Sequence, residues 1–442
     1  MTHAEAGSPA GHPAIAPWAH ELAGALLQPP PAEPTSELLQ LLDPAELLDR
    51  LDCLRTSPPH QGLLSSVGRQ LVHELLQRPW VGSALELLRQ RADQRRRELV
   101  GDGVSFVLNR NLNVSNLCVK HCSFCAFRRD PGQHGAYWLE LGELQQRAAE
   151  AQASGATELC LQGGLNPAAR VGGSAVAYAE ALLRGLHQAA PGIHLHAFSP
   201  QELLFLAEQD GMPLSAVLER LRAAGLGSLP GTAAEVLTER VRLVLCPEKL
   251  SARHWVAVVL EAMAQGLTAT CTLMAGHIEQ PADRVAHLLT LVAMQQWAHA
   301  QRLPGFSEFV LLPFVGEAAP RPLRQRVGRD QPDLAAMLLL TAQARLVLDH
   351  WIANHQPSWV KLTLAGATEA LRWGCNDLGG TLMEEHITTM AGARGGTCQS
   401  PQALTAAALQ LGRPPWQRTT LYAAAGPPSA AAPAPLSSPV LL

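Results

Sequence analysis

The sequence predicts an α/β protein, a (β/α)8 barrel of the TIM type, complete or nearly closed, with an N-terminal helical extension. From residue 104 onward, short apolar runs alternate with longer amphipathic stretches, which is typical of a parallel sheet with right-handed crossovers. About eight such units fit into about 290 residues, and this number suits a barrel. A doubly wound open sheet is the alternative. Its usual G-x-G-x-x-G turn after the first strand is absent, and so is a G-x-x-x-x-G-K-[ST] phosphate loop.

Length and composition are those of a large globular protein. It has 442 residues, a formal net charge of −4 and 47% hydrophobic residues, enough for one large catalytic domain with extensions. The slightly acidic balance argues against nucleic acid or an anionic membrane as the main partner. No apolar run reaches the length of about 18 residues that a membrane span needs, and the first residues lack the order of a signal peptide. We therefore expect a cytoplasmic protein with no nucleic-acid or membrane partner.

The two ends differ in composition from the middle of the chain. Residues 1–35 and 424–442 are rich in Ala and Pro and lack periodicity, so both are expected to be disordered. Residues 36–103 carry leucines at helical spacing and form the expected helical extension. The run of three arginines at 95–97 is interpreted as the solvated face of one of these helices. The barrel is expected over 104–400, followed by a helical or loop segment at 401–423.

The expected strands and helices follow one another along the barrel region. Apolar runs of strand length, rich in β-formers and bounded by turn residues, occur at 105–115, 158–163, 193–199, 226–231, 268–276, 307–314, 358–365 and 379–383. Helical periodicity between them is clearest at 176–188, 252–266 and 335–355. In a barrel, functional groups lie on the loops that follow the carboxyl ends of the strands.

Three cysteines follow the first expected strand directly. Cys118, Cys122 and Cys125 have the spacing C-x3-C-x2-C, which suits a cubane iron–sulfur cluster held at three of its four irons. A structural zinc site usually has a second ligand pair, which is missing here. A disulfide framework is disfavoured because nine cysteines are not dense in a chain of 442 residues. The open iron of such a cluster indicates a catalyst.

Strand alternation predicts which polar side chains face the barrel interior. Asn111 shares one face of the first strand with the asparagines two residues before and after it, and a polar ligand would supply their partners. His196 and His194 point inward from the third strand, and His196 is a candidate catalytic residue. Thr270 lies on the inner face of the fifth strand and is a candidate cofactor contact.

Two further regions contain candidate substrate contacts. Lys361 lies in an apolar run expected to be a strand, where a lysine either reaches out to solvent or pairs inside a polar site. Asn376 and Asp377 precede a pair of glycines and are expected to help close the mouth of the barrel.

Glu235 has two interpretations. Thr232 and Glu235 have the T-x-x-E spacing of a capping box. Ser199 and Glu202 have the equivalent S-x-x-E spacing. Spacing alone favours a helix cap in both places. Glu235 is also kept as a candidate catalytic acid.

The run NRNLNVSNLCVKHCSFCAF resembles the cysteine loop of the radical S-adenosylmethionine (SAM) superfamily. The strings LQGGLNP, HLHAFSPQEL, AGLGSLPGTAAEVL, TCTLMAGHIE and GCNDLGGTLMEE extend the resemblance over roughly residues 100–400. They are similar to those of the tyrosine-utilising subunits of FO synthase, which makes the 8-hydroxy-5-deazaflavin chromophore.

This resemblance implies the cofactors and the reaction. SAM binds the open iron of a [4Fe-4S] cluster, the reduced cluster donates an electron, and a 5′-deoxyadenosyl radical forms. The radical fragments L-tyrosine, and the 4-hydroxybenzyl group passes to 5-amino-6-(D-ribitylamino)uracil. A flavodoxin- or ferredoxin-type reductant and a companion radical SAM subunit are implied as partners. No second C-x3-C-x2-C occurs, so we expect one subunit and not a fused enzyme.

The resemblance also implies roles for residues beside the cysteines. Gly163 and Gly164 match the glycine-rich turn of the family and are expected to receive the methionyl group of SAM, although Leu165 replaces the usual acid. Phe124, just before the third cysteine, is expected to shield the cluster.

Two competing interpretations stay open. Aminofutalosine synthase and related menaquinone-pathway enzymes share the cysteine loop, but usually carry PGGGAE where this chain has PGTAAE, so Thr232 and Ala233 favour the deazaflavin family. A non-catalytic iron–sulfur scaffold or electron-transfer module is the alternative from another class.

Overall fold

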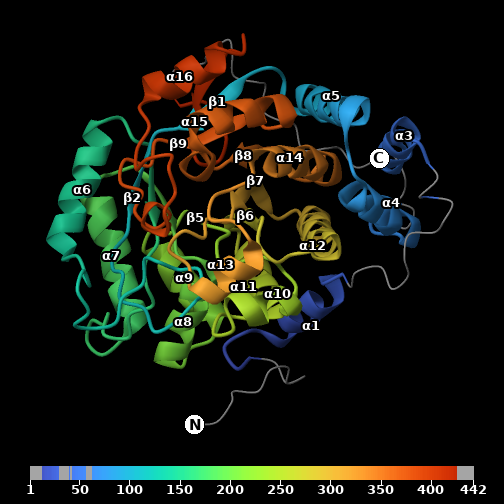
Figure 1. The fold of residues 1–442 in the computed structure, drawn as a ribbon. Helices are drawn as coiled ribbons and strands as arrows, with labels where there is room; N and C mark the ends of the chain where they lie inside the picture. The colour runs from blue at the N-terminus through green and yellow to red at the C-terminus, as the bar shows by residue number, and fades with distance from the viewer. Residues whose placement is uncertain (1–11, 29–38, 40–41, 56–61, 426–442) are drawn as a thin grey trace.

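A curled sheet of seven parallel strands forms the centre of the structure (Figure 1), in the order β2-β3-β4-β5-β6-β7-β8. The computed structural model describes residues 12–28, 39, 42–55 and 62–425. All neighbouring strands in this sheet are parallel, which confirms the predicted α/β class and its barrel-like form. The strands are β2 (Asn109–Leu112), β3 (Glu158–Leu161), β4 (His194–Ala197), β5 (Ser228–Leu229), β6 (Thr268–Ala275), β7 (Phe306–Pro313) and β8 (His355–Pro357).

A second sheet of three strands has the order β10-β1-β9. Its members are β1 (Val104–Val107), β9 (Asp377–Gly380) and β10 (Pro415–Arg418). The single strand expected at 105–115 is therefore divided: β1 pairs with β9 and β10, whereas β2 pairs with β3. The last strand, β10, falls in the segment expected to be helix or loop.

The chain after β9 spans the gap between the edge strands β2 and β8. The hydroxyl of Thr381 donates to the carbonyl oxygen of Asn109 at 2.7 Å and accepts from its backbone N–H at 3.0 Å. The backbone N–H of Asn111 donates to the carbonyl of Leu382 at 2.9 Å, and that of Asn376 to the carbonyl of His355 at 3.1 Å. These bonds bring β9 and the residues after it between the two edges of the curled sheet.

Helices surround the strands on the outside of the barrel (Figure 1). The barrel helices are α6 (Leu141–Ala153), α7 (Ala175–Ala189), α8 (Pro200–Asp210), α9 (Leu214–Ala223), α10 (Glu239–Leu245), α11 (Ala252–Ala264), α12 (Pro281–Ala300), α13 (Arg321–Val327), α14 (Leu334–Leu348), α15 (Trp359–Ala370), η2 (Leu371–Trp373), η3 (Thr389–Ala391) and α16 (Pro401–Leu409). Their apolar faces and the outward faces of the strands form a large core, and a second, smaller core lies where α15 and α16 pack near β1. None of the helices in the described ranges combines the length and apolarity that crossing a membrane requires.

The N-terminal region is helical, as predicted, and it packs on the barrel. Its helices are α1 (Pro17–Leu26), α3 (Pro44–Arg55), α4 (Ser66–Gln77) and α5 (Gly82–Val100). The expectation of disorder over 1–35 is wrong for α1: the N–H of Ala16 donates to Glu261 on α11 at 2.6 Å, and Trp18 stacks on Trp297 of α12. Residues 1–11, 29–35 and 426–442 lie outside the described residues.

Two expectations about particular segments are wrong. The run 358–365, which contains Lys361, begins helix α15, because a short apolar run does not distinguish a buried strand from a buried helix. The strand that does occur nearby, β8, falls at the end of the helical pattern expected at 335–355. The arginine run is not one solvated face either, since Arg96 is 1% exposed and pairs with Asp93.

Candidate active site

A cavity of about 410 Å³ occupies the interior of the barrel. The three cysteines, the glycine pair and Phe124 line it at the carboxyl ends of the strands, as do Glu235 and Lys361. Asn111, His196 and Thr270 line it from the strands themselves. The structure thus brings together the predicted site residues, with two exceptions. Asn376 and Asp377 do not line the cavity.

The cysteine loop is held to two other loops by backbone hydrogen bonds. The N–H of Cys118 donates to the carbonyl of Arg129 at 3.2 Å, and that of Val119 to the carbonyl of Leu165 at 3.1 Å. Ser123 donates to the carbonyl of Leu245 through both its N–H, at 3.0 Å, and its hydroxyl, at 2.8 Å. The loop is therefore fixed on the glycine turn at one side and on the end of α10 at the other.

The donor set of this loop fits a [4Fe-4S] cluster. The three thiols are free and partly buried, and they face one cavity. Such a cluster places each cysteine sulfur on a different iron, so the thiols need not converge on one point. In the part of the chain that the structure describes, no three His, Cys, Asp or Glu side chains are arranged around a single ion. Burial raises the pKa of Cys122 to about 12, with Lys249 opposing it, so this thiol stays protonated until a metal takes the place of its proton.

Gly163 and Gly164 form the edge of the cavity after β3. A Cβ atom on Gly164 would lie 2.1 Å from the carbonyl oxygen of Leu117 and 3.0 Å from the Cβ of Cys118, so only glycine fits against the cysteine loop. The N–H of Gly163 donates to the carboxylate of Glu202 at 3.1 Å, and that of Gly164 to the carbonyl of Ser115 at 2.7 Å. Glycine at position 164 is therefore required first by the packing of the cysteine loop.

Glu235 is not a helix cap. No helix begins at Thr232, and Glu235 has a left-handed φ of 46°. Its carboxylate accepts from Nζ of Lys249 at 2.5 Å, and the same Nζ lies 5.2 Å from the centre of the Phe124 ring. Burial raises the pKa of Glu235, but Lys249, Arg242 and Lys361 together outweigh this effect and the net shift is downward. An ion pair therefore lies beside the cysteine loop.

The second capping-box prediction is confirmed. Ser199 caps α8: its hydroxyl accepts the backbone N–H of Glu202, and the carboxylate of Glu202 accepts the backbone N–H of Ser199. Glu202 also accepts the N–H of Gly163, so one carboxylate joins the start of α8 to the glycine turn.

His196 lies deeper in the cavity. The Nδ1 atom of His196 and the Nε2 atom of His194 each lie 2.7 Å from the hydroxyl oxygen of Ser228. This hydroxyl can donate to one ring and accept from the other. Burial lowers the pKa of His196 to about 4, against the opposing effect of Glu158, so the ring is neutral at pH 7. Thr270 accepts the N–H of Gly231 at 2.7 Å, and it thereby holds the PGTAAE turn against β6.

Asn376 and Asp377 have structural partners at the other end of the barrel, which corrects their expected place at its mouth. Asn376 accepts from Arg345 at 3.0 Å and from the N–H of His355 at 2.9 Å. Asp377 accepts from Arg418 at 2.5 Å and also pairs with Ser105. Asp377 is the first residue of β9 and Asn376 directly precedes it, so both lie at the amino end of the strand and not in the loop that follows it.

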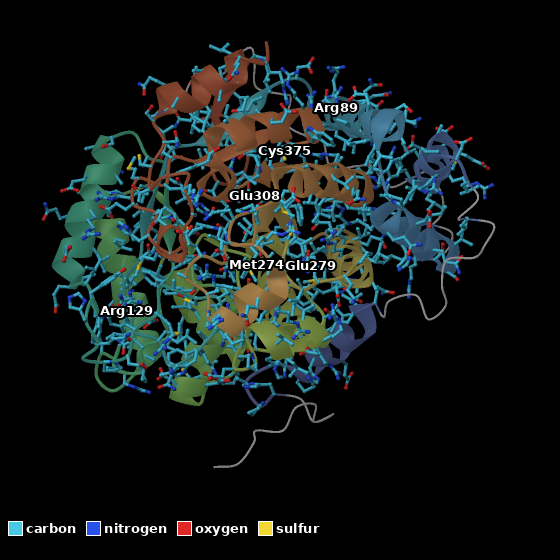
Figure 2. All side chains as sticks on the ribbon, in the orientation of Figure 1. Arg89, Arg129, Met274, Glu279, Glu308 and Cys375 are labelled. Carbon is cyan, nitrogen blue, oxygen red and sulfur yellow. The ribbon has the colours of Figure 1, made fainter. Side chains whose placement is uncertain are left out.

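A buried charged network closes that end of the cavity. Glu308 of β7, which Figure 2 labels, accepts from Arg418 at 3.0 Å and from the hydroxyl of Tyr422. Burial raises the pKa of Glu308 to about 7, with Arg418 opposing and Asp377 adding to the rise. Arg418 and Glu308 line the cavity together with Glu158.

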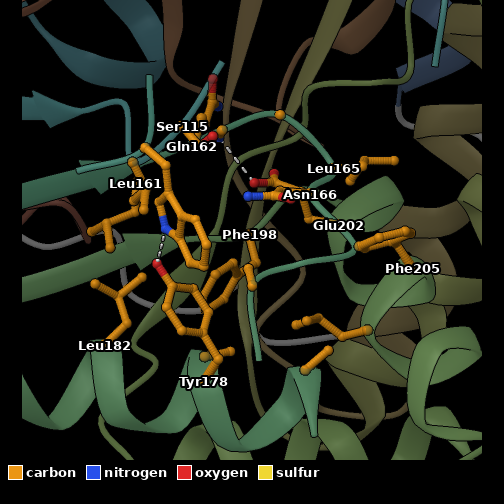
Figure 3. Close-up of a pocket in the computed structure, with 18 residues that line it drawn as sticks. Ser115, Leu161, Gln162, Leu165, Asn166, Tyr178, Leu182, Phe198, Glu202 and Phe205 are labelled. Atoms are coloured by element: carbon orange, nitrogen blue, oxygen red, sulfur yellow. Dashed lines mark hydrogen bonds between the residues drawn. The ribbon is translucent and has the colours of Figure 1, made fainter. Parts of the chain in front are cut away.

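A smaller pocket of about 70 Å³ lies on the other side of the glycine turn (Figure 3). Trp138 and Tyr178 form one wall, and the indole N–H donates to the phenol oxygen at 2.8 Å. Gly163, Gly164 and Glu202 line both this pocket and the barrel cavity. The glycine turn is thus a thin partition between the two spaces.

Sequence reasoning missed Lys249, Glu308 and Arg418. Lys249 is 14 residues from its partner Glu235, and Glu308 and Arg418 are 110 residues apart. A lone charge within an apolar run such as SEFVLLPF is the one feature that could have indicated Glu308. Nothing in the local sequence distinguishes Lys249 or Arg418 from surface residues.

Comparison with known proteins gives a consistent result. Residues 112–292 match the model of the radical SAM superfamily. The chain is 55% identical over 344 residues to a 5-amino-6-(D-ribitylamino)uracil–L-tyrosine 4-hydroxyphenyl transferase of Cyanothece, covering 78% of this chain and 90% of the relative. It is 59% identical over 332 residues to the protein of the same name from Synechococcus elongatus, covering 75% and 86%.

Solved structures share the fold at low sequence identity. The FeFe-hydrogenase maturase HydG from Carboxydothermus hydrogenoformans has a TM-score of 0.63 and 14% identity, over 92% of this chain and 86% of that one. Methylornithine synthase (PylB) has a TM-score of 0.61 and 17% identity, over 84% and 97%. At these identities the likeness supports the barrel fold alone.

Proposed function

The chain belongs to the radical SAM superfamily and, within it, to the family of 5-amino-6-(D-ribitylamino)uracil–L-tyrosine 4-hydroxyphenyl transferases, and we propose on this premise how its residues serve that reaction. The enzyme is a radical SAM transferase that passes the 4-hydroxybenzyl group of L-tyrosine to 5-amino-6-(D-ribitylamino)uracil in deazaflavin biosynthesis. One observation carries the assignment: identity of 54–59% over 86–90% of the length of the named relatives.

Cys118, Cys122 and Cys125 would hold a [4Fe-4S] cluster whose fourth iron takes SAM. The cluster and SAM, when bound, supply the one-electron chemistry that starts the reaction, and a flavodoxin- or ferredoxin-type protein would supply the electron. The glycine turn at 163–164 would form the edge that receives the methionyl group, because its backbone lines the cavity beside Cys118. Phe124 and the Lys249–Glu235 pair would cover the side of the cluster that faces α10.

Within the cavity, neutral His196 would orient a substrate through Nε2, because Nδ1 is occupied by Ser228. Lys361 lines the cavity, and burial lowers its pKa although Glu385 and Glu235 oppose this effect. Its cation would attract the carboxylate of tyrosine near the cysteine loop. The companion radical SAM subunit would then act on the coupled product.

The first test concerns the cluster. We expect Cys122→Ala to lose iron loading and the formation of 5′-deoxyadenosine from SAM under dithionite, because two thiolates do not hold a cubane. Cys398→Ala, at an exposed cysteine away from the cavity, is the control and should retain both properties. Wild-type protein that loads iron but never cleaves SAM would favour the non-catalytic scaffold.

The second test concerns the substrates. Anaerobic wild-type enzyme, given SAM, reductant, tyrosine and the ribitylaminouracil, should form the hydroxybenzyl adduct, which mass spectrometry detects. Turnover of a chorismate-derived enol ether, without the adduct, would assign the chain to the aminofutalosine synthase reaction.

A further inference from the structure

The closed end of the barrel cavity is lined by polar groups that the proposed chemistry at the cysteine loop does not use. Glu158 begins β3, Glu308 lies near the start of β7, and Arg418 and Thr420 come from the C-terminal segment. The strand β3 runs from Glu158 to the glycine turn at Gly163, a rise of about 16 Å at about 3.3 Å per residue. The polar floor is defined by Glu158, Glu308, Arg418 and Thr420, with Asn111 at its upper edge, opposite Cys160. Glu158, at the base of this floor, is therefore remote from the three thiols.

The floor has unused hydrogen-bond acceptors. The side-chain oxygen of Asn111 is buried and accepts no hydrogen bond from any described residue. The Glu158 carboxylate accepts from Nδ2 of Asn109 at 2.7 Å, and a carboxylate has about four acceptor sites. The hydroxyl of Thr420 is also buried and makes no hydrogen bond of normal geometry with a described residue, although it lies near enough to Glu158 to help lower the pKa of that acid. A ligand that brings O–H or N–H donors would satisfy these atoms.

The charges of the floor disfavour an amino acid. Arg418 is paired with both Asp377 and Glu308, and Glu158 adds a third acid to the same network. A free carboxylate placed among these acids would meet like charges in a buried site. Tyrosine carries a carboxylate, whereas the ribityl chain of the second substrate is uncharged and has several hydroxyl groups. A neutral polyol therefore fits the floor better than tyrosine does.

The proposed reaction also requires tyrosine to lie near the cysteine loop and allows the uracil to lie deeper in the cavity. Tyrosine is the substrate that must lie next to SAM and the cysteine loop, where Lys361 provides a cation. The acceptor uracil need only reach the fragment that tyrosine releases, so its far end can lie deeper. The ring of His196 lines the cavity between the two ends, because His196 lies opposite Cys160, about midway between Glu158 and the glycine turn.

We propose that the polar floor binds the ribityl chain of 5-amino-6-(D-ribitylamino)uracil and so selects the acceptor by its polyol. This inference rests on the proposed function and adds to it the place and the recognition of the second substrate. The C-terminal segment thereby contributes to specificity, since Arg418 and Thr420 lie beyond residues 112–292, which carry the superfamily match.

The test compares two acceptors, the ribitylaminouracil and 5,6-diaminouracil, which lacks the ribityl chain. In Thr420→Val and Asn111→Leu, we expect the Kd of the ribityl compound, measured by calorimetry on cluster-loaded protein, to rise about tenfold, which is about 1.4 kcal/mol. The Kd of 5,6-diaminouracil and the KM of tyrosine should change less than about twofold. Thr420→Ser, which keeps the hydroxyl, should restore the affinity.

Thr157→Val is the matched control, because the Thr157 hydroxyl is also buried without a hydrogen-bond partner among the described residues but does not line the cavity. Equal weakening of both uracils, or a rise in the KM of tyrosine alone, would overturn the proposal. The calorimetric readout does not depend on turnover. A wild-type enzyme that binds the ribityl compound but couples neither uracil would contradict the proposed reaction and leave the binding result standing.

Discussion

An added methyl group at Gly164 tests how tightly the cysteine loop packs against the glycine turn. A Cβ atom there would lie 2.1 Å from the Leu117 carbonyl oxygen, which belongs to the loop itself. Gly164→Ala must therefore displace the loop, and overpacking of this kind costs about 1–3 kcal/mol. We expect a lower melting temperature and, after reconstitution with iron and sulfide, fewer iron atoms per chain than in the wild type.

Gly142→Ala provides the control for that substitution. Gly142 lies in α6, and an added Cβ would meet nothing within 4 Å. Since alanine favours a helix over glycine by about 0.5–1 kcal/mol, this variant should match or exceed the wild type in stability and bind as much iron. Equal iron content in the two alanine variants would show that the loop tolerates the contact.

At the residue scale, local patterns were informative where the chemistry is local. The cysteine spacing predicts a cluster because three ligands lie within eight consecutive residues. The Lys249–Glu235 pair could not be predicted, because it depends on a left-handed backbone at Glu235 and on a lysine from another loop. The same spacing rule was right for the cap at Ser199 and wrong at Thr232, since a cap needs a helix to follow it.

At the scale of elements, Asp349 joins the helical extension to the barrel. It ends α14, its side chain is fully buried, and it pairs with Arg95 of α5 and Arg55 of α3. Burial raises its pKa, but the hydrogen bonds from His350 and Arg95, together with the charges of Arg55 and Arg95, outweigh this and hold the pKa of Asp349 well below its usual value. Asp349→Asn would leave two arginines without their buried partner. We expect the free energy of unfolding at pH 7 to fall by about 3–5 kcal/mol.

The ion pairs of Asp349 predict a pH dependence of the stability, and its sign follows from the lowered pKa of Asp349. A carboxyl group that is more acidic in the folded state stabilises the fold above its unfolded pKa, and this contribution is lost as the pH falls. The difference in urea-unfolding free energy between wild type and Asp349→Asn should therefore shrink as the pH falls below about 4. Asp330→Asn is the control, because Asp330 pairs with Arg324 on the surface, where solvent screens the interaction, and should change the stability little at any pH. A difference that grows in acid would contradict this account.

The elements that were wrongly predicted share a physical cause. The run 358–365 is apolar because α15 packs Trp359 and Val360 against the core, and a buried helix of this length has no polar face to reveal its period. Thr363 interrupts that helix with a φ of 65°, which further hides the helical repeat. The long strand expected at 105–115 is divided because β1 and β2 belong to different sheets. The strands with which β1 and β2 pair decide this division, and it is not visible in their own residues.

At the scale of the whole molecule, strand–helix alternation was sufficient for the barrel, because each unit along the chain adds a neighbouring strand. The roles of the chain ends were not predictable. Helix α1 and strand β10 have little periodicity of their own, and they are ordered by contacts with α11 and β1, which lie far away in the sequence. The floor of the site depends on this long-range contact, since Arg418 ends β10.

Closure of the barrel gives the last prediction. Thr381 is 1% exposed, and its hydroxyl serves both the N–H and the carbonyl of Asn109, so it replaces a backbone partner at the edge strand β2. Thr381→Val keeps the shape but leaves both backbone groups unsatisfied, which should cost about 2–4 kcal/mol in urea unfolding. Thr341→Val is the matched control, because that buried hydroxyl donates to the carbonyl of Met337 within α14 and should cost under about 1 kcal/mol. Because the bonds join the segment after β9 to the edge strand β2, Thr381→Val should also speed hydrogen exchange along both β2 and β9. Faster exchange confined to residue 381 would show that closure does not depend on it.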